Sequence, residues 1–432
     1  MADQLISQLT ESANLQDDDL FVIWKDSIQQ TRSIKKKNLG ISGSAGGNPD
    51  RCIVFDFSDS NHKSILIKKG TSFTINYQDI DYVKTWETDT RINLASAMTL
   101  ASSVATTRTG QENGRVFQIF LTTSGDIVLS TRLDAPSDID EIYTTQNTLW
   151  LGYFSTLCVA IPSDQTSSLA VTKNGYAVGN SVNVKGGYYK NDPYGFYSFY
   201  SKIITAISTY IYFDTATVPH VLAGFGAGQI LPESVFCLGF MPKAGNMGNE
   251  GAQGMVYDPD SEKAVDIYLQ SGNGQGTISE YGTSITNSRH LQNHIYDFSC
   301  VRKSLLTYEE FSSCAKGSNE KTNIAGSTQP STTGGHSDTG GKRMVSFIGC
   351  EDACGCMWQW GKNFGASGGS GFTNTYGRND FGQTEGTVYG ERYGGGSNSG
   401  ASSGSRSLAG DDLISHLGGA TSARGCCEII RK

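Results

Sequence analysis

The apolar positions in the middle of the chain follow the two-residue period of β-strands. Ile65 and Ile67 lie two residues apart, as do Phe73, Ile75 and Tyr77. Side chains with this spacing share one face of a strand. The apolar runs 116–121 and 127–129 flank a Thr-Ser-Gly-Asp turn and predict a hairpin, and the run 149–154 predicts a further strand. We expect an antiparallel β-region without a catalytic constellation.

The first 45 residues have a pattern of their own. Leu5, Ile6 and Leu9 have helical spacing, 20–24 and 31–37 read as strands, and the glycine- and serine-rich stretch from Gly40 reads as a linker. An ordinary β-hairpin is one interpretation. A small module for attachment to a virion, comprising residues 1–45, is the other.

A cluster of aromatic residues precedes the next change in pattern. Residues 186–213 hold ten Tyr or Phe side chains. Buried tyrosines need a partner for the hydroxyl, so a subunit interface with trapped water suits them better than a dry core. We therefore assign residues 46–231 to a β-rich, sandwich-like central region that carries subunit contacts.

From residue 232 the elements become shorter and the loops longer. The run 265–269 predicts a strand. Thr307 and Glu310 form a capping box, which predicts a helix from Tyr308 to about Lys316 that stops at Gly317. We expect one domain over residues 232–432, so the fold class is mainly β with an α+β C-terminal domain.

The segment 394–425 is rich in Gly, Ser and Ala and holds few large apolar side chains. Such a segment cannot drive its own burial, so it is either a disordered tail or a polar surface pinned on a scaffold. The strand-like residues 426–430 that follow favour the pinned surface.

Composition excludes several classes of function. The 34 basic and 42 acidic side chains give a net charge of −8, which argues against a nucleic-acid binder. The chain has no apolar run long enough for a membrane span, and its start lacks the pattern of a signal peptide. The ten scattered cysteines are expected to be mostly reduced and buried.

Short motifs of the C-terminal part follow one another in a set order. They are Leu306-Thr-Tyr-Glu-Glu-Phe311, Pro330-Ser-Thr-Thr-Gly334, Gly355-Cys-Met-Trp-Gln-Trp360, Gly377-Arg378, Val388-Tyr389, Gly394-Gly395, Gly404-Ser-Arg406 and Ala423-Arg-Gly425. In this order they resemble the phage tropism determinants, receptor-binding proteins with a C-type lectin fold that retroelements diversify. The same lectin variant is shared with formylglycine-generating enzymes. The resemblance covers residues 232–432, and more weakly 60–165, but not the first 45.

The resemblance assigns residues to a variable set and a scaffold set. The variable, receptor-binding positions would be Gly396, Asn398, Ser399, Gly400, Ser402, Ala409, Asp411, Asp412, His416, Gly418, Ala420 and Thr421. None of the twelve is Trp, Met, Lys, Gln or Glu, the types that adenine mutagenesis of Asn-type codons cannot give. The scaffold would include Trp358, Trp360, Arg406 and Arg424, the two arginines having donor forks that could tie loop carbonyls together. Ser397 departs from the family, which often has Trp there.

The cysteine, histidine and acidic clusters of the chain do not have the complete pattern of a catalytic or metal site. Cys426 and Cys427 are adjacent and cannot bond to each other without strain, and the spacing of Cys350, Cys354 and Cys356 is unlike that of zinc sites. His290 and His294 have i, i+4 spacing but read as surface histidines in a loop. Asp258, Asp260 and Glu262 read as a solvated turn rather than a calcium loop. No cofactor is expected, although a structural divalent cation is allowed.

The sequence thus predicts a non-enzymatic phage receptor-binding protein, most simply a homotrimer at a tail fibre or baseplate tip. Its partners would be a host-surface receptor, protein or glycan, and other virion proteins contacted through the N-terminus. Neither nucleic acid nor membrane insertion is expected. The alternatives are a structural virion decoration protein and an oxidase of the formylglycine-generating type. The sequence does not identify the host or the receptor.

Overall fold

The computed structural model describes residues 20–25, 30–35, 51–94, 113–131, 148–179, 182–185, 209–244, 254–367, 378–379, 382–383 and 387–431. All elements below belong to these residues. The predicted N-terminal strands are present as a hairpin of β1 (Leu20–Lys25) and β2 (Gln30–Lys35). The predicted helix around Leu5 and most of the aromatic cluster 186–213 lie outside the described residues.

The first part of the central region consists of small antiparallel sheets. One sheet has the order β3-β4-β7 and a second is the hairpin β5-β6. Gln78 and Asp79, both with positive φ, form the two-residue turn of that hairpin. The bounds of these strands are Ile53–Phe55 (β3), Ser64–Ile67 (β4), Ser72–Tyr77 (β5), Ile80–Thr85 (β6) and Thr90–Asn93 (β7).

The largest sheet joins the central region to the C-terminal part. Its order is β16-β17-β25-β15-β14-β10-β8-β9, and β18 also pairs with β25. The bounds are Val116–Thr122 (β8), Ile127–Thr131 (β9), Thr148–Ser155 (β10), Phe236–Cys237 (β14), Phe240–Pro242 (β15), Met255–Asp258 (β16), Lys263–Asp266 (β17), Ser304–Leu305 (β18) and Gly425–Arg431 (β25). The predicted hairpin is confirmed, because β8 pairs with β9 from Phe117–Thr131 to Leu121–Ile127.

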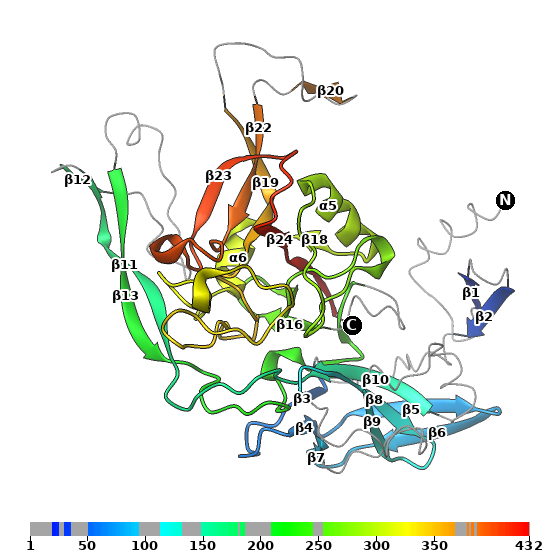
Figure 1. Cartoon of the computed structure of the whole chain (residues 1–432). Helices are drawn as coiled ribbons and strands as arrows, with labels where there is room; N and C mark the ends of the chain where they lie inside the picture. Colours follow the sequence, from blue (N-terminus) through cyan, green and yellow to red (C-terminus); the bar gives the residue numbers. More distant parts are fainter. Residues whose placement is uncertain are drawn as a thin grey trace.

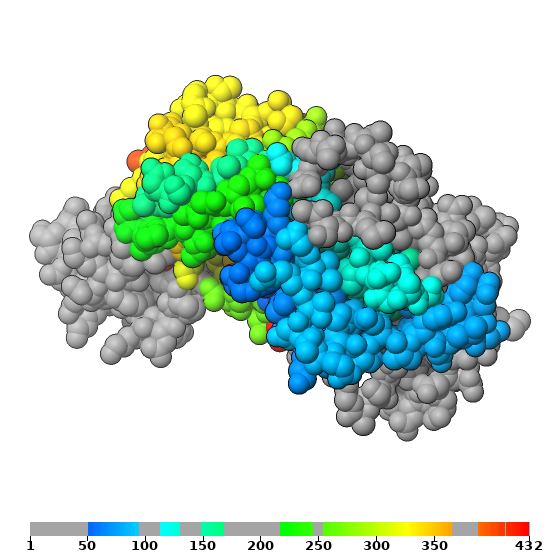
Figure 2. Space-filling view, turned by 90° about the horizontal axis from the view of Figure 1, so that it is seen from below, coloured from blue at the N-terminus to red at the C-terminus, as the bar shows by residue number. Residues whose placement is uncertain are grey.

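This sheet crosses the expected domain boundary at 231/232. Tyr153 of β10 pairs with Phe236 of β14, and β15 pairs in turn with β25. Most of the buried apolar side chains on both sides of the boundary belong to one cluster. In the view from below, residues 51–94 (blue) lie against the segment 217–244 (green), where His62 stacks on Phe225 with ring centroids 3.9 Å apart (Figure 2). The two regions are therefore built around a common core.

A long antiparallel arm extends from the body (Figure 1). It consists of β11 (Thr166–Gly179), β12 (Val182–Lys185) and β13 (Thr209–Pro219), with β11 in the middle. The register of β11 and β13 shifts between Thr172 and Ala177.

The C-terminal part carries a second sheet and both α-helices of the described chain. The sheet has the order β23-β22-β19-β24 and lies at the top of Figure 1. Its strands are Trp358–Ser367 (β19), Thr387–Tyr393 (β22), Leu408–Leu413 (β23) and Thr421–Ala423 (β24), and the short pair Arg378–Asn379 (β20) and Gly382–Gln383 (β21) lies between β19 and β22 in sequence. The helices are Leu291–Cys300 (α5) and Tyr308–Cys314 (α6). None of the helices described is long and apolar enough to cross a membrane.

The predicted helix start is confirmed in detail. The Thr307 hydroxyl accepts from the Glu310 N–H, and the Glu310 carboxylate accepts from the Thr307 N–H at 2.9 Å. The helix ends at Cys314, before the predicted Lys316, and Gly317 has φ 85°. The chain turns away there, which only glycine does at little cost.

The predicted strand 265–269 is shorter than expected. β17 ends at Asp266, because the carbonyls of Asp266 and Ile267 accept hydrogen bonds from the Arg424 guanidinium instead of continuing the ladder. A buried arginine from the far end of the chain thus ends a strand that is apolar enough to continue.

Candidate functional site

The glycine-rich segment 394–425 is part of the C-terminal sheet. It contains the 3₁₀ turn Gly400–Ser402 (η8), then β23, and then β24, before the chain enters β25 in the large sheet. β23 pairs with β22, and β24 pairs in parallel with β19. A surface pinned to a scaffold, rather than a tail, is therefore what the structure contains.

The proposed variable positions differ in exposure. Asn398, Ser402 and His416 are exposed, while Ser399, Gly400, Ala409, Asp412 and Ala420 are partly exposed. Gly396, Gly418 and Thr421 are buried, and the side chain of Asp411 lies outside what the structure describes. Leu408, Leu413 and Leu417 lie among them with 41–57 % of their surface exposed.

Several of these positions converge on Trp358. Thr421 is its partner in the parallel β19–β24 pairing, and a Cβ at Gly396 would lie 2.9 Å from Cδ1 of the indole. The Arg392 guanidinium lies over the ring, 5.1 Å from its centroid. A cation placed over an indole in this way is attracted to the ring face. Trp358 is therefore the centre of the candidate site.

A polar chain runs from this arginine across the strand pair. Arg392 forms an ion pair with Asp412, and the two side chains are only 12 % and 20 % exposed. His416 Nε2 lies 4.0 Å from Asp412 Oδ2. Arg392 was not identified from the sequence. The available signal was that this cation lies between the motifs Val388-Tyr389 and Gly394-Gly395, just before the proposed variable segment.

The loop 320–323 holds the turn 397–405 by several hydrogen bonds. The Asn323 amide donates to the Ser397 carbonyl, and Lys321 N–H donates to the Ser403 carbonyl at 2.7 Å. The Glu320 carboxylate accepts from the Ser405 N–H at 3.0 Å. Burial raises the pKa of Glu320, although Ser405 and the nearby Arg406 act in the other direction. Ser397, at the start of this turn, is buried.

Arg424 ties the end of β17, the loop at Glu351 and strand β19 to the end of the proposed variable segment. Its side chain is 1 % exposed. Nη1 donates to the carbonyls of Asp266 and Ile267 at 2.7 and 2.5 Å, Nη2 donates to the Glu351 carbonyl at 2.6 Å, and Nε donates to Gln359 Oε1 at 3.1 Å. This is the role that the sequence suggested for an arginine fork.

The two tryptophans have different surroundings. Trp360 is 1 % exposed and packs against Leu291, Phe298 and Leu305 below the sheet. Trp358 is only partly buried, contrary to the expectation that it anchors the core. The reason is its place at the start of β19, where the neighbouring positions are Gly396 and the edge strand β24. Arg406 is half-buried, and its carbonyl accepts from the Tyr308 hydroxyl at 2.8 Å.

The expectation of two surface histidines in a loop is wrong. His290 is the N-cap of α5 and His294 lies within the helix, fully buried. His294 Nδ1 pairs with Gln270 Oε1 at 2.5 Å. Burial, assisted by the charge of Arg289, lowers the pKa of His294 to about 3. A neutral buried histidine bonded to an amide is a structural group.

The turn with Asp258, Asp260 and Glu262 joins β16 to β17. Asp258 is buried and accepts from Asp260 N–H at 3.2 Å and from the Ser261 hydroxyl at 2.7 Å, while Asp260 and Glu262 are exposed. The expected solvated turn is present at Asp260 and Glu262, whereas Asp258 is buried because its carboxylate closes the turn.

The cysteines are buried except for the partly exposed Cys300, as expected. Cys426 and Cys427 are neighbours in β25, so their side chains point to opposite faces of the sheet. Burial raises the pKa of both thiols, that of Cys427 to about 11. This disfavours a jointly metal-binding pair. Among the described residues, His336, Asp352 and Cys356 do bring possible metal ligands together.

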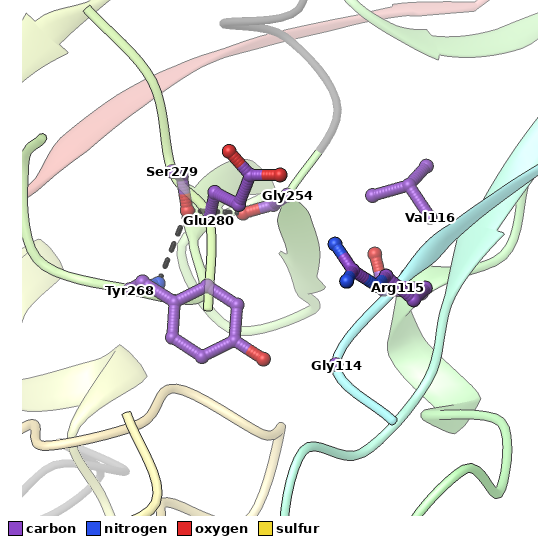
Figure 3. Close-up of a pocket in the computed structure, with 8 residues that line it drawn as sticks. Gly114, Arg115, Val116, Gly254, Tyr268, Ser279 and Glu280 are labelled. Carbon is purple, nitrogen blue, oxygen red and sulfur yellow. Dashed lines mark hydrogen bonds between the residues drawn. The ribbon is translucent and has the colours of Figure 1, made fainter. Parts of the chain in front are cut away.

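A small hollow between the central region and the C-terminal part is about the size of one water molecule. It is lined by Arg115, Val116, Tyr268, Glu280 and their neighbours (Figure 3). On one wall the Tyr268 N–H donates to Ser279 Oγ, and the Ser279 hydroxyl donates to the Gly254 carbonyl at 2.7 Å. The Ser279 hydroxyl thus holds the wall of the hollow together.

Taken together, these features define a C-type lectin fold whose second sheet presents a polar surface, joined to a β-rich body. The same fold occurs in solved structures of Major Tropism Determinant variants. The I1 variant matches with a TM-score of 0.59 and 18 % identity over 95 % of this chain and 92 % of its own. The M1 variant matches with a TM-score of 0.58 and 19 % identity over 95 % of this chain and 92 % of its own. The P3c variant matches with a TM-score of 0.57 and 18 % identity over 96 % of this chain and 94 % of its own. No protein-family model and no curated protein matches the chain.

Proposed function

We propose that the protein is a phage receptor-binding protein that recognises a host-surface receptor through the sheet β23-β22-β19-β24. One observation carries the proposal: positions 396–421 form a surface on which most side chains are small, while two of the side chains that hold it, Arg424 and Asn323, are buried. Such a design lets the exposed side chains of the segment change without loss of the fold. The likeness to the Major Tropism Determinant structures, which extends over almost the whole chain, supports it.

The contact would be non-covalent. The twelve variable positions hold five Gly or Ala, three Ser or Thr, two Asp, one Asn and one His. They lack the Tyr, Trp and Arg side chains that dominate binding hot spots. Outside the variable set, Trp358 and Arg392 supply a Trp and an Arg. We expect the receptor to contact these two residues, while the variable residues around them select which receptor binds.

A single site of this kind binds weakly. We propose a homotrimer at a tail fibre or baseplate tip, attached to other virion proteins through residues 1–45, so that several sites act at once. Effective concentration alone raises apparent affinity by about 10²–10⁴. A solution mass near three times the 46.4 kDa of one chain would support the trimer, and a monomer at micromolar concentration would exclude it.

Binding to cells tests the proposed surface. The fluorescently labelled full chain would be titrated on a panel of bacterial strains, beside the triple variant N398A/S402A/H416A and a matched triple of exposed residues at the other end of the molecule, N61A/K69A/T88A. We expect binding to a subset of strains that the first triple abolishes and the second retains. Equal binding by both triples would contradict the proposed surface.

A structural virion protein is a second candidate, because Leu408, Leu413 and Leu417 expose apolar surface within the same segment. Such a protein would pack this surface against a neighbouring virion protein. Excess purified full chain would then leave phage adsorption unchanged, whereas a receptor-binding protein would block it.

Active diversification is a separate part of the proposal. It predicts, near the gene, a near-copy of the segment encoding residues 394–425 that differs at adenines, with a reverse transcriptase gene beside it.

A further inference from the structure

The loops behind the variable surface bring together three side chains of metal-binding type. His336 follows a glycine pair, and Asp352 and Cys356 belong to the loop that precedes β19. Their ligand atoms all lie within 4.8 Å of one another. The three residues come from positions that no common zinc spacing contains, which explains why the sequence alone did not reveal them.

One carboxylate oxygen of Asp352 has no hydrogen-bond partner among the described residues. Its side chain is 1 % exposed. Oδ2 accepts from the Gly334 N–H at 2.8 Å and pairs with His336 Nδ1 at 2.8 Å, whereas Oδ1 is buried and has no partner among the described residues. A buried carboxylate oxygen without a partner is costly in an apolar surrounding, and a bound cation would remove that cost.

The surrounding charges leave room for a cation. Arg343 lies nearby and donates to the His336 carbonyl, but both Glu351 oxygens accept from its Nη2, at 2.9 and 2.8 Å. The charge of this arginine is therefore already balanced by Glu351. A divalent ion bound by the Asp352 carboxylate and a Cys356 thiolate would make a neutral group, the favourable condition for a buried site.

We propose that His336, Asp352 and Cys356 bind a Zn²⁺ ion. A nitrogen, a carboxylate oxygen and a thiolate together suit Zn²⁺ and not Ca²⁺ or Mg²⁺, which prefer oxygen ligands alone. Tetrahedral ligands of Zn²⁺ lie about 3.3–3.6 Å apart, so small side-chain rotations would close the cluster around the ion. His336 is 24 % exposed and gives the ion a route from solvent.

Binding is a simple exchange without redox change. The Cys356 S–H bond breaks, its proton passes to solvent, and the thiolate electron pair forms the Zn–S bond. The ring proton that His336 shares with Asp352 leaves the nitrogen that binds the ion, by transfer to the other ring nitrogen or to solvent. With three protein ligands, the fourth position remains for water.

The position of the ion gives it a structural consequence. Cys356 pairs with Gly396 in a parallel bridge, and the Gly355 N–H donates to the Gly394 carbonyl at 3.0 Å. An ion held by Cys356 would therefore stiffen the point where the variable segment begins.

Zinc titration of the full chain tests the site. The chain, reduced and stripped with a chelator, would be titrated with Zn²⁺ against a chromophoric competitor. We expect one ion per chain with micromolar or tighter affinity, a higher Tm with Zn²⁺, and no competition from Mg²⁺. H336Q, which alters the most exposed ligand and so endangers folding least, should weaken binding at least tenfold. C354S is the matched control, because Cys354 is a buried thiol outside the cluster.

Cobalt distinguishes the thiolate from other donors. Co²⁺ in the wild-type chain and in C354S should show the sulfur-to-metal charge-transfer absorption, and H336Q should need at least tenfold more Co²⁺ to show it. The absence of Zn²⁺ binding in the wild type, unchanged affinity in H336Q, a loss in C354S equal to that in H336Q, or a cobalt complex without the sulfur band would each overturn the proposal.

Discussion

At the scale of single residues, long side chains hold a C-terminal part that has little regular structure. Arg424 satisfies three carbonyls and an amide oxygen that no helix or strand satisfies. A buried carbonyl left without a partner costs about 1–3 kcal/mol, so the loss of this one side chain affects several such groups together.

Arg424→Lys should therefore destabilise the protein strongly. A lysine keeps the charge but cannot reach three directions at once, and we expect a loss of about 3–5 kcal/mol in the free energy of unfolding. Urea denaturation of the full chain measures it. Arg431→Lys is the control, since Arg431 is 46 % exposed in its ion pair with Glu262 and should change stability by less than about 1 kcal/mol.

His294 makes stability depend on pH. Its folded pKa of about 3 lies below the ordinary 6.5, so the folded state favours the neutral ring. Its contribution is complete above pH 6.5 and is lost as the pH falls towards 3. Between pH 7 and 5 we expect a loss of about 2 kcal/mol from this group.

Denaturation at both pH values would check this loss in wild type, H294Q and H416Q. The loss between pH 7 and 5 should be smaller by that amount in H294Q, which has no titrating ring. H416Q should behave as wild type, because His416 is on the surface. Identical pH profiles for all three proteins would remove His294 as the cause.

At the scale of elements, β19 divides scaffold from surface within three residues. Trp360 contacts α5 and the core below the sheet, whereas Trp358 contacts Arg392 and the proposed variable positions. From the sequence we expected both tryptophans to anchor the fold, because the sequence shows the size of a side chain but not how deeply it is buried. Only the pairing of β19 with the edge strand β24 places one of them at the surface.

Substitution of the two tryptophans should separate these roles. Trp360→Ala should cost about 3–5 kcal/mol, as expected for a fully buried large aromatic. Trp358→Ala should cost clearly less and should reduce binding to strains that the wild type recognises. Equal losses of Tm in the two variants would argue against the division.

Asp412→Asn tests the strand pair β22–β23 in the same way. The ion pair with Arg392 is partly exposed, so its loss should cost about 1 kcal/mol or less. The variant should nevertheless change which strains are bound, because Arg392 over Trp358 then loses its ion pair with residue 412. Glu428→Gln, which alters the exposed pair with Lys263, is the control and should leave the choice of strain unchanged.

The sequence predicted local features well and long-range ones poorly. The capping box at Thr307 and the hairpin of β8 and β9 depend on neighbouring residues, and both are confirmed. The burial of His294, the role of Arg392 and the early end of β17 depend on residues far away in sequence. No short-range pattern carries that information.

At the scale of the whole molecule, the large sheet makes the central region and the C-terminal part depend on each other. The expected boundary at 231/232 remains a prediction, but Phe236 and Cys237 lie between β10 on one side and β15 on the other. The fragment 232–432 would lose β8 to β10 and expose a hydrophobic sheet edge.

We expect the fragment 232–432 to aggregate or to unfold at low temperature, whereas the full chain folds. Size-exclusion chromatography and circular dichroism of the two proteins would show the difference. A monodisperse, cooperatively melting fragment would establish an independent domain at this boundary.

The strand β25 follows the variable segment in the chain yet lies inside the large sheet, paired with β15, β17 and β18. During translation, this central strand is therefore synthesised only after all codons of the proposed variable positions have been translated. Adenine mutagenesis of Asn-type codons neither creates a stop codon nor shifts the reading frame, so under the proposed diversification every variant keeps this strand. A copy truncated or frameshifted in the segment by another route would lack the strand on which the sheet closes and would be eliminated during folding, before it is assembled into a particle.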